Sequence, residues 1–244
     1  GREMRKFFVA RDGYVLVDAD YSQIELRVLA HISGDRNMIK AFNDNTDIHT
    51  VTASEVFDMP PQLVTPIMRS RAKAVNFGIV YGIGAFSLAK DIGVSRSEAD
   101  EYIKGYLRHY SGVDKYMHDV VEKAKKDGYA ETMFARRRYL PELTASNANT
   151  RAFGERVARN MPIQGTAADI IKIAMIRVFE RLERENLAAK LIMQVHDELI
   201  VEAPENEKER VSALLKEEME NAVKLSVALT ADVHSGRTWY DAKG

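Results

Sequence analysis

The sequence contains no cysteine, and this absence excludes both a disulfide framework and a thiolate metal site. No apolar run approaches the ~18 residues that a membrane-spanning helix needs, and no signal peptide is recognisable, so no membrane association is expected. Lysine and arginine (35) nearly balance aspartate and glutamate (36), so the net charge is −1. Any binding of nucleic acid must therefore come from local clusters. With 45% hydrophobic residues, the 244-residue chain can bury the core of one large domain or two small ones.

The most informative stretch runs from Arg69 to Gly84. Thr65-Pro66 precedes it and predicts the start of a helix, because threonine caps free N–H groups and proline is tolerated in the first turn. One helix face carries two cations followed by two aromatic residues at every fourth position: Arg69, Lys73, Phe77 and Tyr81. Such a row can bind a triphosphate and offer flat faces to a base. By itself it is equally consistent with a solvated basic edge beside two core aromatics.

Carboxylates cluster in two other places. The strand predicted over 14–20 puts Asp18 and Asp20 on one face at its end, which is costly unless a cation meets them. A hairpin predicted over 191–201 has His196, Asp197 and Glu198 in its turn instead of the usual glycine or asparagine, and such a departure often marks function. Ser22-Gln-Ile-Glu25 fits a capping box, so Glu25 also has a purely structural explanation.

The remaining pattern is mostly helical. Residues 35–61 read as mixed and polar with a turn at 43–45, and the three arginines at 136–138 read as a turn. A helix beginning at Asn149 is expected to end at Met161-Pro162, before a separate helix that is apolar almost all round and therefore central and buried. We expect further elements over 96–110 behind a Ser95 capping box, 113–126, 129–134, 170–182, from 206 onward, and 226–234.

If the ends of the strand and the hairpin meet in one sheet, two or three carboxylates converge without cysteine. Oxygen ligands of this kind favour Mg²⁺ or Mn²⁺ over zinc. Two such ions support phosphoryl transfer by activating the attacking oxygen and stabilising the leaving one.

Three motifs then resemble motifs A, B and C of the family A DNA polymerases. They are Asp20-Tyr-Ser-Gln-Ile-Glu-Leu-Arg27, Arg69-(x)3-Lys73-(x)3-Phe77-Gly-(x)2-Tyr81-Gly82, and Gln194-Val-His-Asp-Glu198. They occur in order, and the similarity runs over essentially the whole chain. The resemblance implies template-directed addition of dNTPs to a primer 3′-OH, with two Mg²⁺ ions (Mn²⁺ as a substitute) and release of pyrophosphate.

The resemblance also implies individual roles. Asp20, Asp197 and the Tyr21 backbone carbonyl would bind metal, with Glu198 nearby, and Lys73 would also act as general acid. The nucleotide would be bound by Arg69, Lys73, Phe77, Tyr81, Gln23, His49 and Glu25. Of these, Glu25 would exclude a ribose 2′-OH, and Phe77, where some relatives have tyrosine, implies discrimination against dideoxynucleotides. The primer-template minor groove would be lined by Arg156, Asn160, Gln164 and His196.

The implied fold is α+β: a small antiparallel palm sheet backed by helices, with a mostly α-helical fingers insertion. We expect palm at 1–34, fingers at 35–149 and palm again at 150–244, in a monomer of the bacterial cytoplasm that binds primer-template DNA and dNTPs. The chain opens with Gly-Arg-Glu, and the thumb, the first palm segment and the exonuclease domains of the family are missing, so we interpret it as a piece of a longer protein.

Two alternatives stay open at this point. Without the thumb, the fragment could be a dNTP- and DNA-binding module with little turnover, because much of DNA affinity comes from phosphate contacts. A single-subunit RNA polymerase relative is the other alternative, and a gate at Glu25 argues against it.

Overall fold

A computed structural model describes residues 2–243, which form two compact units. We call Gly1–Ile24 with Ala167–Gly244 the sheet unit, and Glu25–Thr166 the helical unit. Both ends of the chain therefore contribute to one unit, and the other is an insertion between them. Within the described residues, no helix has the length and apolar character needed to span a membrane.

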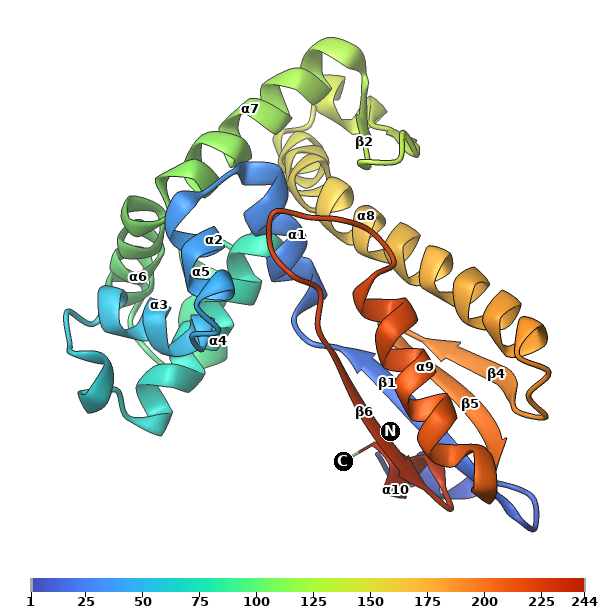
Figure 1. Ribbon diagram of the computed structural model, residues 1–244. Helices are drawn as coiled ribbons and strands as arrows, with labels where there is room; N and C mark the ends of the chain where they lie inside the picture. The colour runs from blue at the N-terminus through green and yellow to red at the C-terminus, as the bar shows by residue number, and fades with distance from the viewer. Residues whose placement is uncertain (1, 244) are drawn as a thin grey trace. The chain divides into compact units, whose positions relative to one another are not determined.

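The sheet unit is built on four strands: β1 (Tyr14–Tyr21), β4 (Lys190–Val195), β5 (Glu198–Pro204) and β6 (Ala231–Gly236). Their order is β4-β5-β1-β6, and every neighbouring pair is antiparallel (Figure 1). This confirms the α+β prediction of a small antiparallel sheet. The closing strand begins at Ala231, later than the pattern over 226–234 predicted.

Helix α9 (Lys208–Glu220) packs against one face of the sheet (Figure 1). Its inward positions are fully buried, and the Tyr21 hydroxyl donates a hydrogen bond to the Met219 carbonyl at 2.7 Å. The opposite face of β1 carries a second small core. It includes residues from the short helix α10 (Trp239–Ala242) and from both central strands: Ala10, Leu16, Ile200, Trp239 and Ala242.

The helical unit contains α1 (Ile24–Ser33, whose first residue belongs to the sheet unit), α2 (Arg36–Asn43), α3 (Ile48–Val56), α4 (Pro66–Val80), α5 (Ala85–Ile92), α6 (Arg96–His109), α7 (Ser111–Asp127) and the hairpin β2 (Tyr129–Glu131) and β3 (Arg137–Tyr139). Short 3₁₀ turns occur in both units: at Arg2–Phe7 and Glu205–Glu207 in the sheet unit, and at Pro61–Leu63 and Pro141–Thr144 in the helical unit. The capping box at Ser95 is present. One prediction was wrong, because Arg137-Arg138 lie in a strand rather than a turn. The polar segment 35–61 contains α2 and α3, and the chain turns between them at 44–45, within the turn predicted at 43–45.

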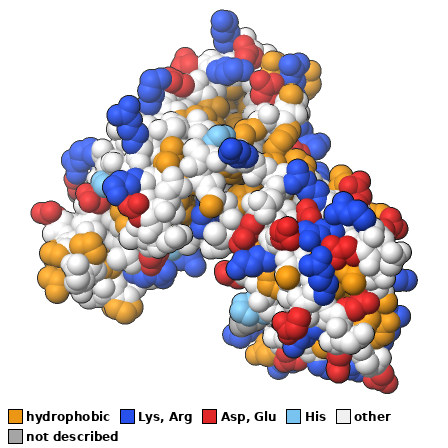
Figure 2. All heavy atoms as spheres, viewed as in Figure 1, with side chains coloured by type: hydrophobic (Ala, Val, Ile, Leu, Met, Phe, Trp, Pro, Cys, Tyr) orange, Lys and Arg blue, Asp and Glu red, His pale blue; other side chains and the backbone are white. Residues whose placement is uncertain are grey.

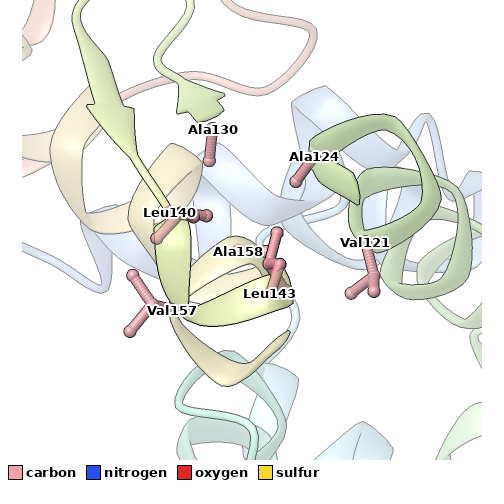
Figure 3. Close-up of a cluster of buried hydrophobic side chains, with 7 residues drawn as sticks. All are labelled: Val121, Ala124, Ala130, Leu140, Leu143, Val157 and Ala158. Carbon is pink, nitrogen blue, oxygen red and sulfur yellow. The ribbon is translucent and has the colours of Figure 1, made fainter. Parts of the chain in front are cut away.

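Helix α8 (Ala148–Arg184) corrects the prediction of a break at Met161-Pro162, because it runs through Pro162 without interruption. Packing compensates for the missing N–H group. On the N-terminal side, Val157 and Ala158 join a core cluster with side chains of α7, β2 and the segment after β3 (Figure 3). The C-terminal half of α8 was predicted to be buried all round, but Ile176 is 56% exposed and Phe179 is 51% exposed.

Charge is mixed over the visible face of the sheet unit, where Lys and Arg side chains alternate with Asp and Glu (Figure 2). Many of these charges form pairs at helical spacing or between elements; Arg181, for example, contacts Glu185, Glu217 and Glu218. The face seen in Figure 2 is therefore not uniformly basic, in keeping with the net charge of −1.

A buried carboxylate joins two helices of the helical unit. Asp35, 3% exposed, accepts hydrogen bonds from the backbone N–H of Met38 at 2.9 Å and of Gly112 at 2.8 Å. It thereby caps α2 and ties it to the start of α7. The approach is close enough to require glycine, since a Cβ at position 112 would lie 2.8 Å from the Asp35 Cα.

Replacing Asp35 with alanine leaves both N–H groups without their acceptor. We expect Asp35→Ala to lower the free energy of unfolding by about 2–4 kcal/mol. Urea unfolding followed by circular dichroism measures this value. Asp91→Ala, at an exposed aspartate, is the matched control and should change it by less than ~0.5 kcal/mol. Equal effects of the two substitutions would contradict the capping role.

Candidate active site

The sheet brings three of the predicted acidic residues together. Asp20, near the end of β1, pairs in register with Glu198, the first residue of β5. The Tyr21 backbone N–H donates to the Asp197 carbonyl at 3.1 Å, which fixes the hairpin turn beside the end of β1. The carboxylates of Asp20, Asp197 and Glu198 therefore lie at one end of the sheet, as the sequence predicted.

The hairpin turn uses a backbone conformation that is uncommon for residues other than glycine. His196 has φ 52°, in the left-handed region that a tight two-residue hairpin turn requires. The Gln194 side-chain amide donates to the His196 carbonyl at 2.7 Å and supports this turn. The turn thus forms without glycine and carries the side chains of His196 and Asp197 where glycine would carry none.

A lysine side chain lies among these carboxylates. The Lys243 ammonium group donates to Asp20 Oδ2 at 2.7 Å and also bonds Glu198 Oε2. The second oxygen of each carboxylate, Asp20 Oδ1 and Glu198 Oε1, is buried and has no hydrogen-bond partner in the described structure. Buried carboxylate oxygens normally have partners, so this position has spare capacity to bind a cation.

The crowding of acidic groups changes their proton affinities. Burial, followed by repulsion from Glu198 and Asp20, raises the pKa of Asp18 to about 7, although Lys243 and the Trp239 indole N–H (3.1 Å) oppose the shift. Burial and the charge of Asp20 likewise raise the pKa of Asp197 to about 6. Both shifts are typical of sites that bind a cation or perform proton chemistry.

The donor set fits a hard divalent cation. Within residues 2–243, no group of three or more His, Asp or Glu side chains is placed so that it could hold a metal ion. Mg²⁺ rarely requires one, because it keeps several waters and uses one or two carboxylates. The side chain of Tyr21 points to the α9 face, so only its backbone carbonyl remains as a possible ligand.

In the helical unit, α4 separates the two predicted faces. Ala72, Val75 and Ile79 are buried, whereas Arg69, Lys73 and Tyr81 are exposed and Phe77 is half-buried. The Arg69 Nε bonds Asp47 Oδ2 at 2.5 Å, and Lys73 has no hydrogen bond or ion pair with any described residue. His49, from α3, lies against Phe77 with the ring centroids 5.8 Å apart. The structure therefore places His49 beside the cationic row.

Glu25 and Tyr81 contact each other, because the Tyr81 hydroxyl donates to Glu25 Oε2 at 3.0 Å. Tyr81 caps the end of α4, and Gly82 follows with φ 67°. Tyr81 and Gly82, together with Arg156 of α8, line a groove of about 700 Å³. Helix α8 also presents Asn160 and Gln164, half-buried and at successive four-residue steps from Arg156 on the same face.

Two predicted residues belong to the sheet unit instead. Gln23 precedes α1 with φ 55°, and His196 is in the hairpin turn. Three relevant residues were not assigned a role from the sequence: Asp18, Lys243 and Asn76. Asp18 had a signal, since alternation puts it on the face of Asp20. Lys243 had none, because nothing local predicts that a lysine 223 positions away contacts Asp20. Asn76 is fully buried beside His49.

The raised pKa of Asp18 predicts the pH dependence of stability. The folded state binds a proton up to about pH 7, whereas an unfolded aspartate releases it near 3.8. Folded protein thus binds more protons in this window, and stability falls as pH rises from about 4 to 7. Asp18→Asn can retain the Trp239 contact and should raise the unfolding free energy by about 1–3 kcal/mol at pH 8, with little change at pH 4.5.

Urea titrations in EDTA across this pH range test the prediction. Glu209→Gln, at an exposed glutamate on α9, should leave the pH slope unchanged. Parallel slopes for Asp18→Asn and the unsubstituted chain would show that Asp18 does not titrate as stated.

Comparison with known proteins shows which family the chain resembles over its length. The sequence model of DNA polymerase family A matches residues 1–241. The chain is 53% identical over its whole length to DNA polymerase I of Caldicellulosiruptor bescii and 48% identical to the thermostable DNA polymerase I of Thermus thermophilus. It spans 29% of the length of each of these relatives.

A solved structure, the POL domain of Pol1 from M. smegmatis in complex with DNA primer-template and dNTP, is 45% identical to the chain. It superposes with a TM-score of 0.94, over all of this chain and 43% of that one. The motifs, the fold and the similarity along the full length lead to one assignment: the chain belongs to DNA polymerase family A.

Proposed function

We propose that the chain catalyses template-directed DNA synthesis, in which a primer 3′-OH attacks the α-phosphate of a dNTP and pyrophosphate leaves. The observation that carries the proposal is the convergence of Asp20, Asp197 and Glu198 around buried carboxylate oxygens that lack partners. Family membership and the solved complex of a relative with primer-template and dNTP support it.

Asp20 and Asp197, with the Tyr21 carbonyl, would hold two Mg²⁺ ions, or Mn²⁺ in their place. When bound, such ions make the attacking oxygen more nucleophilic and stabilise charge on the leaving oxygen. Glu198 contributes negative charge beside them. Lys243 supports this assignment, because its ammonium group already occupies a cation position between Asp20 and Glu198.

The cationic row of α4 would bind the triphosphate. Arg69 offers a planar guanidinium group, although it must exchange its bond to Asp47 for one to phosphate. Lys73 has no competing partner among residues 2–243, so it can bind phosphate directly and protonate the leaving pyrophosphate. Phe77 would stack beside the nucleotide, with His49 on the triphosphate and Gln23 as a further contact.

Glu25 and Tyr81 would control what enters the site. Their hydrogen bond holds the Glu25 carboxylate in place, where its bulk can exclude a 2′-OH, and Tyr81 would occupy the position of the templating base until the nucleotide binds. Arg156, Asn160, Gln164 and His196 would donate to minor-groove acceptors, which are alike for every correct base pair. Such contacts sense the shape of the pair without reading sequence.

The chain spans less than a third of the length of its curated relatives. This favours a second candidate function, a dNTP- and DNA-binding module with little turnover, because the chain matches only 43% of the solved polymerase domain that is in complex with primer-template and dNTP. In either case we propose a monomer acting in the bacterial cytoplasm.

Single-nucleotide primer extension with Mg²⁺, at enzyme excess over DNA, tests the proposal. The chain should extend the primer, and Asp197→Ala should reduce the rate by at least about 10³-fold, because loss of a carboxylate ligand removes several kcal/mol of charge stabilisation. Glu209→Ala is the control and should keep the full rate.

The other outcomes separate the alternatives. Absence of extension with intact binding of a fluorescent dNTP would favour the binding module. Extension that survives in Asp197→Ala would mean that the metal site is elsewhere.

The proposed gate makes a prediction about sugar selectivity. Glu25→Ala should increase the incorporation of ribonucleotides relative to deoxynucleotides by about tenfold or more, since a steric penalty of ~1.4 kcal/mol is already worth a factor of ten. Competition between rNTP and dNTP on one primer measures the ratio. Glu55→Ala, at an exposed glutamate of α3, should leave it unchanged. A ratio unaffected by Glu25→Ala would assign this residue a structural role alone.

A further inference from the structure

A chain of buried polar side chains connects α3, α4 and the start of α7. His49, Thr52 and Asn76 are each at most 2% exposed. The Asn76 Nδ2 lies 3.1 Å from His49 Nδ1, and Thr52 Oγ1 lies 3.1 Å from Asn76 Oδ1 and 3.2 Å from the Tyr110 hydroxyl. Burial makes each of these bonds costly to lose.

The hydrogen bonds of this network can all be donated in one consistent direction, from Tyr110 toward His49. Burial raises the pKa of the Tyr110 hydroxyl, which therefore keeps its proton and can donate to Thr52. The Thr52 hydroxyl then donates to the Asn76 carbonyl oxygen, which can only accept. This turns the Asn76 amide nitrogen, which can only donate, toward His49 Nδ1.

His49 Nδ1 must then accept, so the proton of the neutral ring resides on Nε2. Burial, followed by the nearby cations Arg69 and Lys73, lowers the pKa of His49 to about 4 against the opposing charge of Asp47. The ring is thus uncharged at neutral pH. Its Nε2 makes no hydrogen bond to any described residue, and it belongs to the side chain that lies against Phe77 beside the cationic row.

We propose that Asn76 is a positioning residue that holds His49 in the Nε2–H tautomer, aimed to donate a hydrogen bond to a phosphate oxygen of the bound nucleotide. The inference rests on the proposed triphosphate site and adds how its histidine is oriented. An imidazole held in this way is a directional neutral donor beside two cations. Its contact with phosphate stays constant across the pH range in which a free histidine would titrate.

The tautomer is measured directly by long-range ¹H–¹⁵N correlation spectra of the chain labelled at histidine. His49→Gln assigns the signal among the six histidines. At pH 7 the expected spectrum shows a protonated Nε2 and an unprotonated Nδ1. A protonated Nδ1 in the unsubstituted chain would overturn the inference, whatever the nucleotide affinity.

Two substitutions at Asn76 change the bond in different ways. Asn76→Leu keeps a similar volume but removes the donor, so a substantial Nδ1–H population should appear. Asn76→Asp presents only an acceptor, so Nδ1 should carry a proton and His49 should titrate nearer neutrality. Thr52→Val, which releases the Asn76 amide, should shift the population in the direction of Asn76→Leu. If either Asn76 variant fails to fold, Thr52→Val and the unsubstituted chain still decide the matter.

Nucleotide binding gives the second readout. Competition of dATP with a fluorescent dNTP should show about three- to tenfold weaker binding for Asn76→Leu, the scale of one misaligned hydrogen bond to a charged acceptor. Asn206→Leu, at an exposed asparagine, should change binding by less than about twofold. Unchanged affinity in Asn76→Leu together with an altered tautomer would overturn the positioning role. If the unsubstituted chain shows the expected tautomer but His49→Gln binds nucleotide with unchanged affinity, the proposed nucleotide contact of His49 would instead be refuted.

Discussion

Concentrated negative charge at one end of the sheet is the constraint on which the rest of the sheet unit depends. Four carboxylates, from Asp18, Asp20, Asp197 and Glu198, influence one another, and Asp18 and Glu198 are almost fully buried. Such a group of like charges is unstable unless cations or protons neutralise it. In this structure the negative charge is reduced by the Lys243 ammonium group, by the Trp239 indole N–H and by the raised pKa values of Asp18 and Asp197. The same excess of negative charge suits the position to bind divalent cations.

The situation in the helical unit is the opposite, because the residues proposed to bind the triphosphate are cations. Arg69 and Lys73 stay exposed on α4, and their repulsion contributes to keeping the nearby buried histidine neutral. Beneath them, the bonds from Tyr110 through Thr52 and Asn76 to His49 satisfy buried polar groups in one consistent direction. This buried polar network under an exposed cationic row supports the proposal that the histidine donates to a phosphate from a fixed orientation.

Much of the architecture followed from local patterns. Alternation predicted β1 and the β4–β5 hairpin, and cap signals predicted α4, α6 and α7. Pro162 misled the prediction, because its local cost is outweighed by the core that Val157 and Ala158 form with residues distant in sequence. The apolar character of 170–182 also misled it, since a hydrophobic residue such as Ile176 can remain exposed on a helix.

Residue type and spacing along single strands and helices were enough to identify the family and its motif residues. The groups that neutralise the carboxylates and the residue that contacts His49 Nδ1 became visible only in the folded chain. Lys243 contacts Asp20 across 223 positions, and Asn76 contacts His49 across 27. Contacts at such separations arise from the packing of whole elements, which no local pattern of residues encodes.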